Sequence, residues 1–130
     1  MNEKTKQEGY IRMSDHLQKM ERSSARSKVM TESTPKVMGA FHEIYDQVCK
    51  DGVVPFKNKV LIAVGIGVAI RCQCCIDHHV QSAVRAGVKR EEIVEALEVA
   101  ILMGGGPSTH YGALALEAYD EIAQSETGAA

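Results

Sequence analysis

Apolar residues recur every three or four positions along most of this chain, which is the spacing of an amphipathic helix. The first clear helix is predicted from Pro35, which suits a first helical turn, to a stop at Gly52. Its apolar positions are Val37, Met38, Phe41, Ile44, Tyr45 and Val48. A second helix, roughly Pro55 to Ile70, is apolar on nearly every side and is expected to be central.

The same spacing predicts three further helices. One carries Ile76, His79, Val80, Ala83 and Val84 on one face and stops at Gly87. The next, Glu91 to Met103, has acidic residues in its first turn, where the helix dipole favours them. After a glycine-rich break, Pro107 opens a last helix that reaches Ile122. No strand pattern competes, so the predicted fold class is all-α, a compact bundle of about five to six helices.

The two ends of the chain are less apolar than the rest. A charge-rich, weakly amphipathic segment covers Ser14 to Met30, and residues 1–9 are polar and expected to fray. Residues 1–34 are therefore predicted to be a peripheral helix or an arm, and residues 35–123 the helical domain. Residues 124–130 are expected to form a disordered tail.

Composition places the chain among ordinary globular proteins. Of 130 residues, 45% are hydrophobic and 25% charged, and the net charge of −2 predicts neither a nucleic acid nor a membrane as partner. The longest apolar run, Val60 to Ile70, is too short to span a bilayer. No signal peptide pattern opens the sequence, so a cytoplasmic location is expected.

The cysteines add chemistry to this picture. Cys72, Cys74 and Cys75 fall within four positions, while Cys49 stands apart and is expected to be a small buried hydrophobe. A structural disulfide framework would spread its cysteines along a small secreted chain. Clustering in a chain long enough to build its own core favours redox catalysis or metal binding instead.

The spacing of this cluster is that of a thiol redox centre. Cys72 and Cys75 form a C-x-x-C motif at a predicted helix start, where unpaired backbone N–H groups stabilise a thiolate. His79 follows Cys75 by one helical turn, so the two side chains share a face. An imidazole in that place can take the thiol proton.

Other interpretations of the cluster remain open. Cys74 and His78 repeat the one-turn spacing on an adjacent face, as a second thiol pair or by coincidence. Cys72, Cys75 and His79 are also good zinc ligands, although the second ligand pair of most structural zinc sites is missing. Haem attachment is disfavoured because Ile76, rather than a histidine, follows the second cysteine.

From about Val54 to Tyr119 the chain resembles the carboxymuconolactone decarboxylase superfamily, specifically its AhpD-like alkylhydroperoxidase branch. The resemblance rests on an apolar helix leading into Cys72-x-x-Cys75-x-x-x-His79, then Ala83 to Gly87, Glu91 to Leu97 and Met103 to Pro107, in that order. It implies an all-helical protein that assembles as a trimer or hexamer. It also implies thiol-dependent reduction of a peroxide or disulfide substrate without any cofactor.

The resemblance further implies a role for each residue of the motif. Cys75 would attack the peroxide, Cys72 would resolve the sulfenic acid as a disulfide, and His79 would relay the proton. A thiol protein or a dithiol would then reduce the disulfide. Members with the namesake decarboxylase activity lack the C-x-x-C, and in a decarboxylase-like enzyme a polar residue such as His110 would matter instead.

The chain departs from the peroxidase pattern at two positions. Val60 stands where peroxidase members carry the glutamate of the proton relay, and Cys74 stands where some of them have a histidine. Asp77 or His78 could substitute as proton acceptor. These departures favour the wider description, a thiol–disulfide oxidoreductase.

Overall fold

The computed structural model describes the backbone of residues 2–126 and the side chains of residue 2 and residues 16–126. It confirms the all-α prediction, because the described backbone forms six helices joined by short links and contains no strand. The helices are α1 (Glu3–Ser33), α2 (Pro35–Val48), α3 (Phe56–Ala69), α4 (Gln73–Arg85), α5 (Arg90–Gly104) and α6 (Gly106–Glu126).

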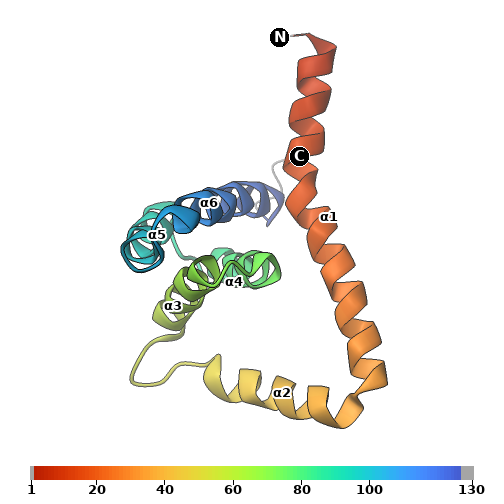
Figure 1. Cartoon of the computed structure of the whole chain (residues 1–130), viewed down its shortest axis with the longest axis vertical. Coiled ribbons are helices and arrows are strands. Elements are labelled where there is room, and N and C mark those ends of the chain that lie inside the picture. Colours follow the sequence, from red (N-terminus) through yellow and green to blue (C-terminus); the bar gives the residue numbers. More distant parts are fainter. Residues whose placement is uncertain (1, 127–130) are drawn as a thin grey trace.

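The arrangement has two parts. Helices α3 to α6 pack together into a bundle, and α1 runs along one side of it as a long rod (Figure 1). At the lower end of α1 the chain turns at Thr34, and α2 passes beneath the bundle. The N-terminal segment is thus an extended helical frame rather than a fifth member of the bundle.

The predicted helices of the bundle lie within a few residues of their expected bounds. Gly87, with φ of 77°, adopts the left-handed conformation that ends α4, as its position after the apolar pattern indicated. The N-terminal helix is longer than predicted, because the helical backbone begins at Glu3 rather than near Ser14. Of the tail, residues 124–126 belong to α6, and residues 127–130 lie outside the described part.

The hydrophobic core lies between α3, α4, α5 and α6. It is made of Val60, Val64, Val68, Ile76, Val80, Ala83, Val88, Ile93, Leu97, Ala100, Ala115, Ala118 and Ile122. Helix α3 is central as expected, since it contacts α4, α5 and α6. Ile62 and Ile66 of α3, and Ile70 just after it, are nevertheless more than half exposed, because no described part of the chain covers that face.

A buried polar contact attaches α1 to the bundle. The imidazole Nδ1 of His16 lies 3.0 Å from a carboxylate oxygen of Asp77 in α4, and both side chains are almost fully buried. The carboxylate of Glu121 in α6 accepts hydrogen bonds from the backbone N–H groups of His16 and Leu17, at 3.3 Å each. The side chain of Leu17 also packs against the core.

Helix α2 has no fully buried residue, although its sequence has a clear apolar face. Phe41 and Ile44 remain about 60% exposed. One side chain of α3 and one of the link between α2 and α3 hold the end of α2 close to α3. The ammonium group of Lys59 donates to the backbone carbonyls of Val48 and Lys50, at 3.1 and 2.9 Å, and the carboxylate of Asp51 accepts from the backbone N–H of Phe56 at 2.8 Å.

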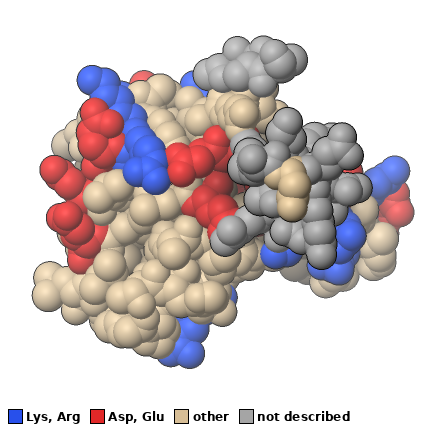
Figure 2. Space-filling view, turned by 90° about the horizontal axis from the view of Figure 1, so that it is seen from above, with Lys and Arg blue, Asp and Glu red and all other residues tan. Residues whose placement is uncertain are grey.

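Charged side chains of both signs share the surface. On the face seen in Figure 2, acidic and basic residues lie side by side next to a broad area without charge. The exposed ion pair of Arg90 with Asp120, at 2.7 Å, is an example of such mixing. Within the described part of the chain, no helix is both long and apolar enough to cross a membrane.

Candidate redox site

Cys72 and Cys75 are joined by a disulfide at the start of α4. Cys72 is the residue that caps the helix, with an extended backbone, and Cys75 lies in the first turn, so their Cα atoms are 5.2 Å apart. The backbone N–H of Cys75 donates to the sulfur of Cys72 at 3.3 Å. In the reduced protein this donor would stabilise negative charge on the Cys72 sulfur.

The link between α3 and Cys72 is short and contains one strained residue. Helix α3 ends in a Schellman motif. The N–H of Arg71 donates to the carbonyl of Val68, and the N–H of Cys72 donates to the carbonyl of Gly67. This pattern requires a left-handed residue, and Arg71 fills the position with φ of 60°, where glycine is usual. A non-glycine residue held there costs about 1–2 kcal/mol. The rest of the fold therefore imposes this turn immediately before the first cysteine.

Helices α3 and α4 run in opposite directions and approach closely beside the disulfide. A side chain at Gly67 would place its first carbon 3.5 Å from the Cβ of Cys75, so only a small residue leaves this approach undisturbed. One turn further along α4 is His79, on the same face as Cys75. Cys75 thus lies against α3 at the end of the contact between α3 and α4 where Gly67 stands.

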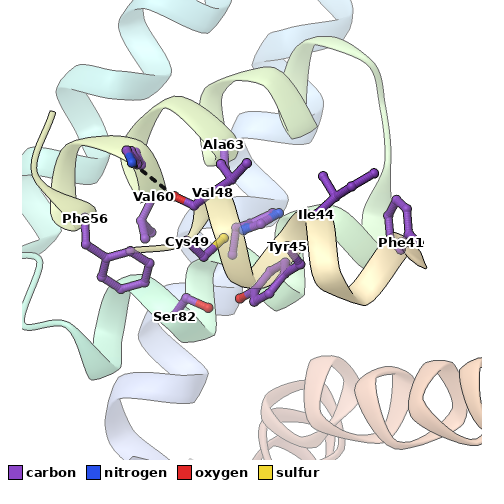
Figure 3. A pocket seen from close by; sticks show the side chains of 11 residues that line it. Phe41, Ile44, Tyr45, Val48, Cys49, Phe56, Val60, Ala63 and Ser82 are labelled. Carbon is purple, nitrogen blue, oxygen red and sulfur yellow. Dashed lines mark hydrogen bonds between the residues drawn. The ribbon is translucent and has the colours of Figure 1, made fainter. Parts of the chain in front are cut away.

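Further from the disulfide, α3 and α4 border a partly open cavity of about 240 Å³, which α2 lines on its outer side (Figure 3). It is lined by Phe41, Ile44, Tyr45, Val48 and Cys49 from α2 and its end, Phe56, Lys59, Val60 and Ala63 from α3, and His79 and Ser82 from α4. No carboxylate is among these side chains. Val60, at the position of the expected glutamate, is 3% exposed and forms part of the apolar wall.

A polar cluster lies at the edge of this cavity, where α2 faces α4. The phenol oxygen of Tyr45 lies 3.2 Å from Nε2 of His78. The rings of Tyr45 and His78 meet edge to face with centroids 5.6 Å apart, and the rings of His78 and His79 do so at 5.0 Å. A chain of contacts therefore leads from His79 through His78 to the phenol.

Burial sets the charge of these groups. Burial, together with the neighbouring His78, lowers the pKa of His79, and partial burial with the nearby charge of Arg85 lowers the pKa of His78. Burial and the adjacent Cys49 raise the pKa of the Tyr45 phenol, although a hydrogen bond with Ser82 acts in the opposite direction. Near neutral pH both imidazoles are therefore uncharged proton acceptors and the phenol keeps its proton.

The structure places the other predicted residues apart from this cavity. Asp77 is buried on the opposite side of α4, where it contacts His16 and accepts a hydrogen bond from the Gln73 amide at 3.2 Å. Cys74 is an exposed free thiol. His110 is exposed in the first turns of α6 and does not line the cavity. Asp77 is thus a packing residue in this geometry and not a neighbour of His79.

Cys49 differs from its expected role as a buried hydrophobe. It ends α2 as a half-buried free thiol and lines the cavity, because α2 is not enclosed by the bundle. As for the metal alternative, no three His, Cys, Asp or Glu side chains among the described residues are grouped so as to hold an ion. Cys72 and Cys75 are instead bonded to each other.

The sequence does not reveal the part of the site that α2 contributes, because Tyr45 is only one apolar position of an amphipathic helix there. It also does not single out Ser82 of α4 or Lys59 of α3. The one available signal was the polar tip of Tyr45 within an otherwise apolar stripe. Nothing in the sequence indicated that this stripe would face His78 and His79.

Comparison with known proteins places the fold and this motif in a family. The model of the carboxymuconolactone decarboxylase family matches residues 35–118. A solved structure of the apo form of a carboxymuconolactone decarboxylase family protein from Legionella pneumophila is similar, with a TM-score of 0.82 and 34% identity, over 85% of this chain and 98% of that one.

Curated relatives give the same result. An uncharacterized protein of Cupriavidus necator is 35% identical over 91 residues, which is 70% of this chain and 80% of the relative. Uncharacterized protein 4 of the cox locus of Paracoccus denitrificans is 33% identical over 103 residues, 79% of this chain and 93% of the relative. The chain belongs to the carboxymuconolactone decarboxylase family.

Proposed function

We propose that this protein is a thiol–disulfide oxidoreductase whose Cys72–Cys75 pair cycles between dithiol and disulfide. The observation that carries the proposal is the pairing of these two cysteines at the start of α4, with His79 one turn beyond Cys75. Family membership supports an enzyme of this class, since the family includes both decarboxylases and alkylhydroperoxidases. The oxidant would be a disulfide or a peroxide, and a dithiol or thiol protein would be the reductant.

The groups around the cysteines suit consecutive steps of such a cycle. His79 would take the proton of Cys75, whose thiolate attacks the oxidant. Cys72, whose sulfur accepts the N–H of Cys75, would then attack Cys75 and close the disulfide. An external dithiol would reduce that disulfide and be oxidised in turn.

The apolar side chain of Val60 favours thiol–disulfide exchange over peroxide reduction as the main activity. Peroxide reduction expels an alkoxide or hydroxide, which are strong bases and need a proton donor. The cavity lining offers no carboxylate for this purpose. Exchange between thiols and disulfides expels a much weaker base, so we favour disulfide exchange as the principal activity and peroxide reduction as a secondary one.

Anaerobic titration of the protein's own thiols, after removal of small molecules, before and after one equivalent of oxidant tests this proposal. The reduced wild-type protein is expected to lose two titratable thiols, because each turnover joins two sulfurs. The Cys74→Ser variant should lose the same number, and Cys75→Ser should not form the intramolecular disulfide. An unchanged thiol count in the wild-type protein would refute the proposal.

We also propose that copies of this chain associate with one another. Large apolar side chains remain exposed on α2, α3 and α5, among them Phe41 at 60%, Ile66 at 55% and Leu102 at 80%. Soluble monomers rarely leave contiguous apolar patches of more than a few hundred Å² exposed. A second copy of the chain would cover these faces.

Light scattering coupled to size exclusion tests the association. A species several times the chain mass of 14.2 kDa is expected for the wild-type protein. Leu102→Asp should reduce that mass, because it buries a charge in the contact. Ser125→Asp adds the same charge at an exposed polar position near the end of α6, away from these faces, and should leave the mass unchanged. A wild-type protein that is monomeric at high concentration would contradict the proposal.

A further inference from the structure

Tyr45 occupies an unusual position for a residue of a peripheral helix. It is one of the few half-buried side chains of α2, and its phenol points into the cavity that His79 and Ser82 line from the other side (Figure 3). Its oxygen is held 3.2 Å from Nε2 of His78. The nearby Ser82 and Cys49 also interact with it. The phenol is therefore fixed in place at the polar end of an otherwise apolar cavity.

The cavity extends from this phenol toward the reactive cysteine as far as His79, and neither Cys72 nor Cys75 lines it. His79 lines the cavity together with Tyr45, and Cys75 lies one turn before His79 on the same face of α4. On the other wall, Val60 and Ala63 line the cavity, and Gly67, one turn beyond Ala63, lies against Cys75. A molecule bound in the cavity would thus have one end beside His79, one helical turn from Cys75, and the remainder beside Tyr45.

We infer that Tyr45 is the proton donor of this redox site and that it protonates the thiolate that a substrate disulfide releases. The inference rests on the proposed oxidoreductase function and assigns a residue to the task that a carboxylate at the position of Val60 would otherwise perform. It also specifies the substrate class. The substrate is a small, largely apolar disulfide with an aliphatic thiol as leaving group.

The reaction is a thiol–disulfide exchange in two steps. The Cys75 thiolate attacks one sulfur of the substrate disulfide, forming a Cys75–substrate bond and breaking the substrate S–S bond. The departing thiolate takes the phenol proton of Tyr45 while Nε2 of His78 passes a proton to the phenol oxygen, so that no free phenolate forms. His78, which is in contact with solvent, takes a proton from water on its other ring nitrogen. Cys72 then displaces the second thiol from Cys75. The substrate gains two electrons, and the cysteine pair loses two.

The surroundings of Tyr45 suit a donor. The phenol is protonated near neutral pH, and His78 is uncharged and can pass protons in either direction. No carboxylate lines the cavity. Of the other proton-bearing side chains of the lining, Lys59 donates to backbone carbonyls, whereas the Tyr45 phenol contacts His78, through which a proton can be replaced from solvent.

The test compares two leaving groups in reduced wild-type protein and in Tyr45→Phe. With 4,4′-dithiodipyridine, the leaving group is stable without a proton, and the variant should react as fast as the wild type. With 2-hydroxyethyl disulfide, the leaving group is an aliphatic thiolate, and the variant should react roughly tenfold more slowly. Tyr119→Phe is the matched control, because the phenol of Tyr119 donates to the carbonyl of Val88 at 2.7 Å, away from the cavity.

Each outcome has one meaning. Selective slowing with the aliphatic disulfide in Tyr45→Phe, and none in Tyr119→Phe, supports the inference. Equal rates for wild type and Tyr45→Phe with both disulfides, or equal slowing with both, would overturn it while leaving the oxidoreductase proposal intact. If the wild-type protein reacted with neither disulfide, the proposed function would fail together with this inference.

Discussion

Replacing Asp77 with alanine is expected to lower the free energy of unfolding by about 3–5 kcal/mol, the usual cost of removing one partner from a buried ion pair. Asp77 is 2% exposed and lies 3.0 Å from the imidazole of His16, which is 1% exposed. Without the carboxylate, the imidazole of His16 would remain buried with no acid on α4 to pair with. Urea unfolding at pH 6 and at one protein concentration measures the change.

The cost should depend on pH in a defined direction. The hydrogen bond to Asp77 raises the pKa of His16, and the charges of Asp77, Glu117 and Glu121 add to this effect while burial opposes it. A group with a raised folded-state pKa stabilises the protein fully below its unfolded value, about 6.5 for histidine. That stabilisation is lost as the pH rises through the folded-state value. The difference between wild type and Asp77→Ala should therefore shrink above neutral pH.

An exposed ion pair supplies the control for this prediction. Asp120 contacts Arg90 at 2.7 Å, and both side chains are about half exposed. Asp120→Ala should cost less than about 1 kcal/mol, as exposed pairs generally do. Equal losses in Asp77→Ala and Asp120→Ala would show that the contact between α1 and α4 contributes no more to stability than a surface pair.

Replacing His79 with glutamine is expected to slow the reaction of the reduced protein with an aliphatic disulfide by about 10²-fold at pH 7, the lower end of the range for general acid–base catalysis. The neutral imidazole, whose pKa burial lowers, can take the thiol proton of Cys75, and an amide cannot. Stopped-flow measurement of the first-order phase at saturating disulfide gives the rate.

The same measurement at higher pH separates proton transfer from a structural effect. Above the pKa of an ordinary thiol, about 8.5, the thiolate forms without a base, so the deficit of His79→Gln should shrink. His110→Gln alters an exposed histidine that does not line the cavity and should leave the rate unchanged. A deficit that persists undiminished at high pH would assign His79 a role in packing instead of proton transfer.

The bundle was predictable from the sequence because local rules and tertiary packing agree there. Helices α3 to α6 have apolar faces that meet in one core, and their ends coincide with residues such as Gly87 and Pro107. The N-terminal helix was predicted too short, since its charged residues form helix well but give little apolar periodicity. The apolar face of α2 gave a helix correctly and suggested nothing about the cavity that it covers.

The candidate site likewise has a part that the sequence predicts and a part that it does not. The relation of Cys72, Cys75 and His79 follows from their spacing in one helix, so the sequence contained it. The contact of His78 with Tyr45 joins residues 33 positions apart, and that of His16 with Asp77 joins residues 61 positions apart. Neither contact leaves a periodic signal in the sequence. Hence Asp77 was considered a possible proton acceptor, although it lies on the side of α4 that binds α1.

The most direct test of the central claim is a redox equilibrium of the Cys72–Cys75 pair. The protein would be incubated anaerobically in defined ratios of reduced to oxidised glutathione, alkylated, digested and mapped by mass spectrometry. The proposal predicts reversible, complete conversion between the dithiol and a Cys72–Cys75 disulfide, with Cys74 and Cys49 in no intramolecular disulfide at any ratio. An intramolecular disulfide that involved Cys74, or no intramolecular disulfide at any ratio, would contradict it.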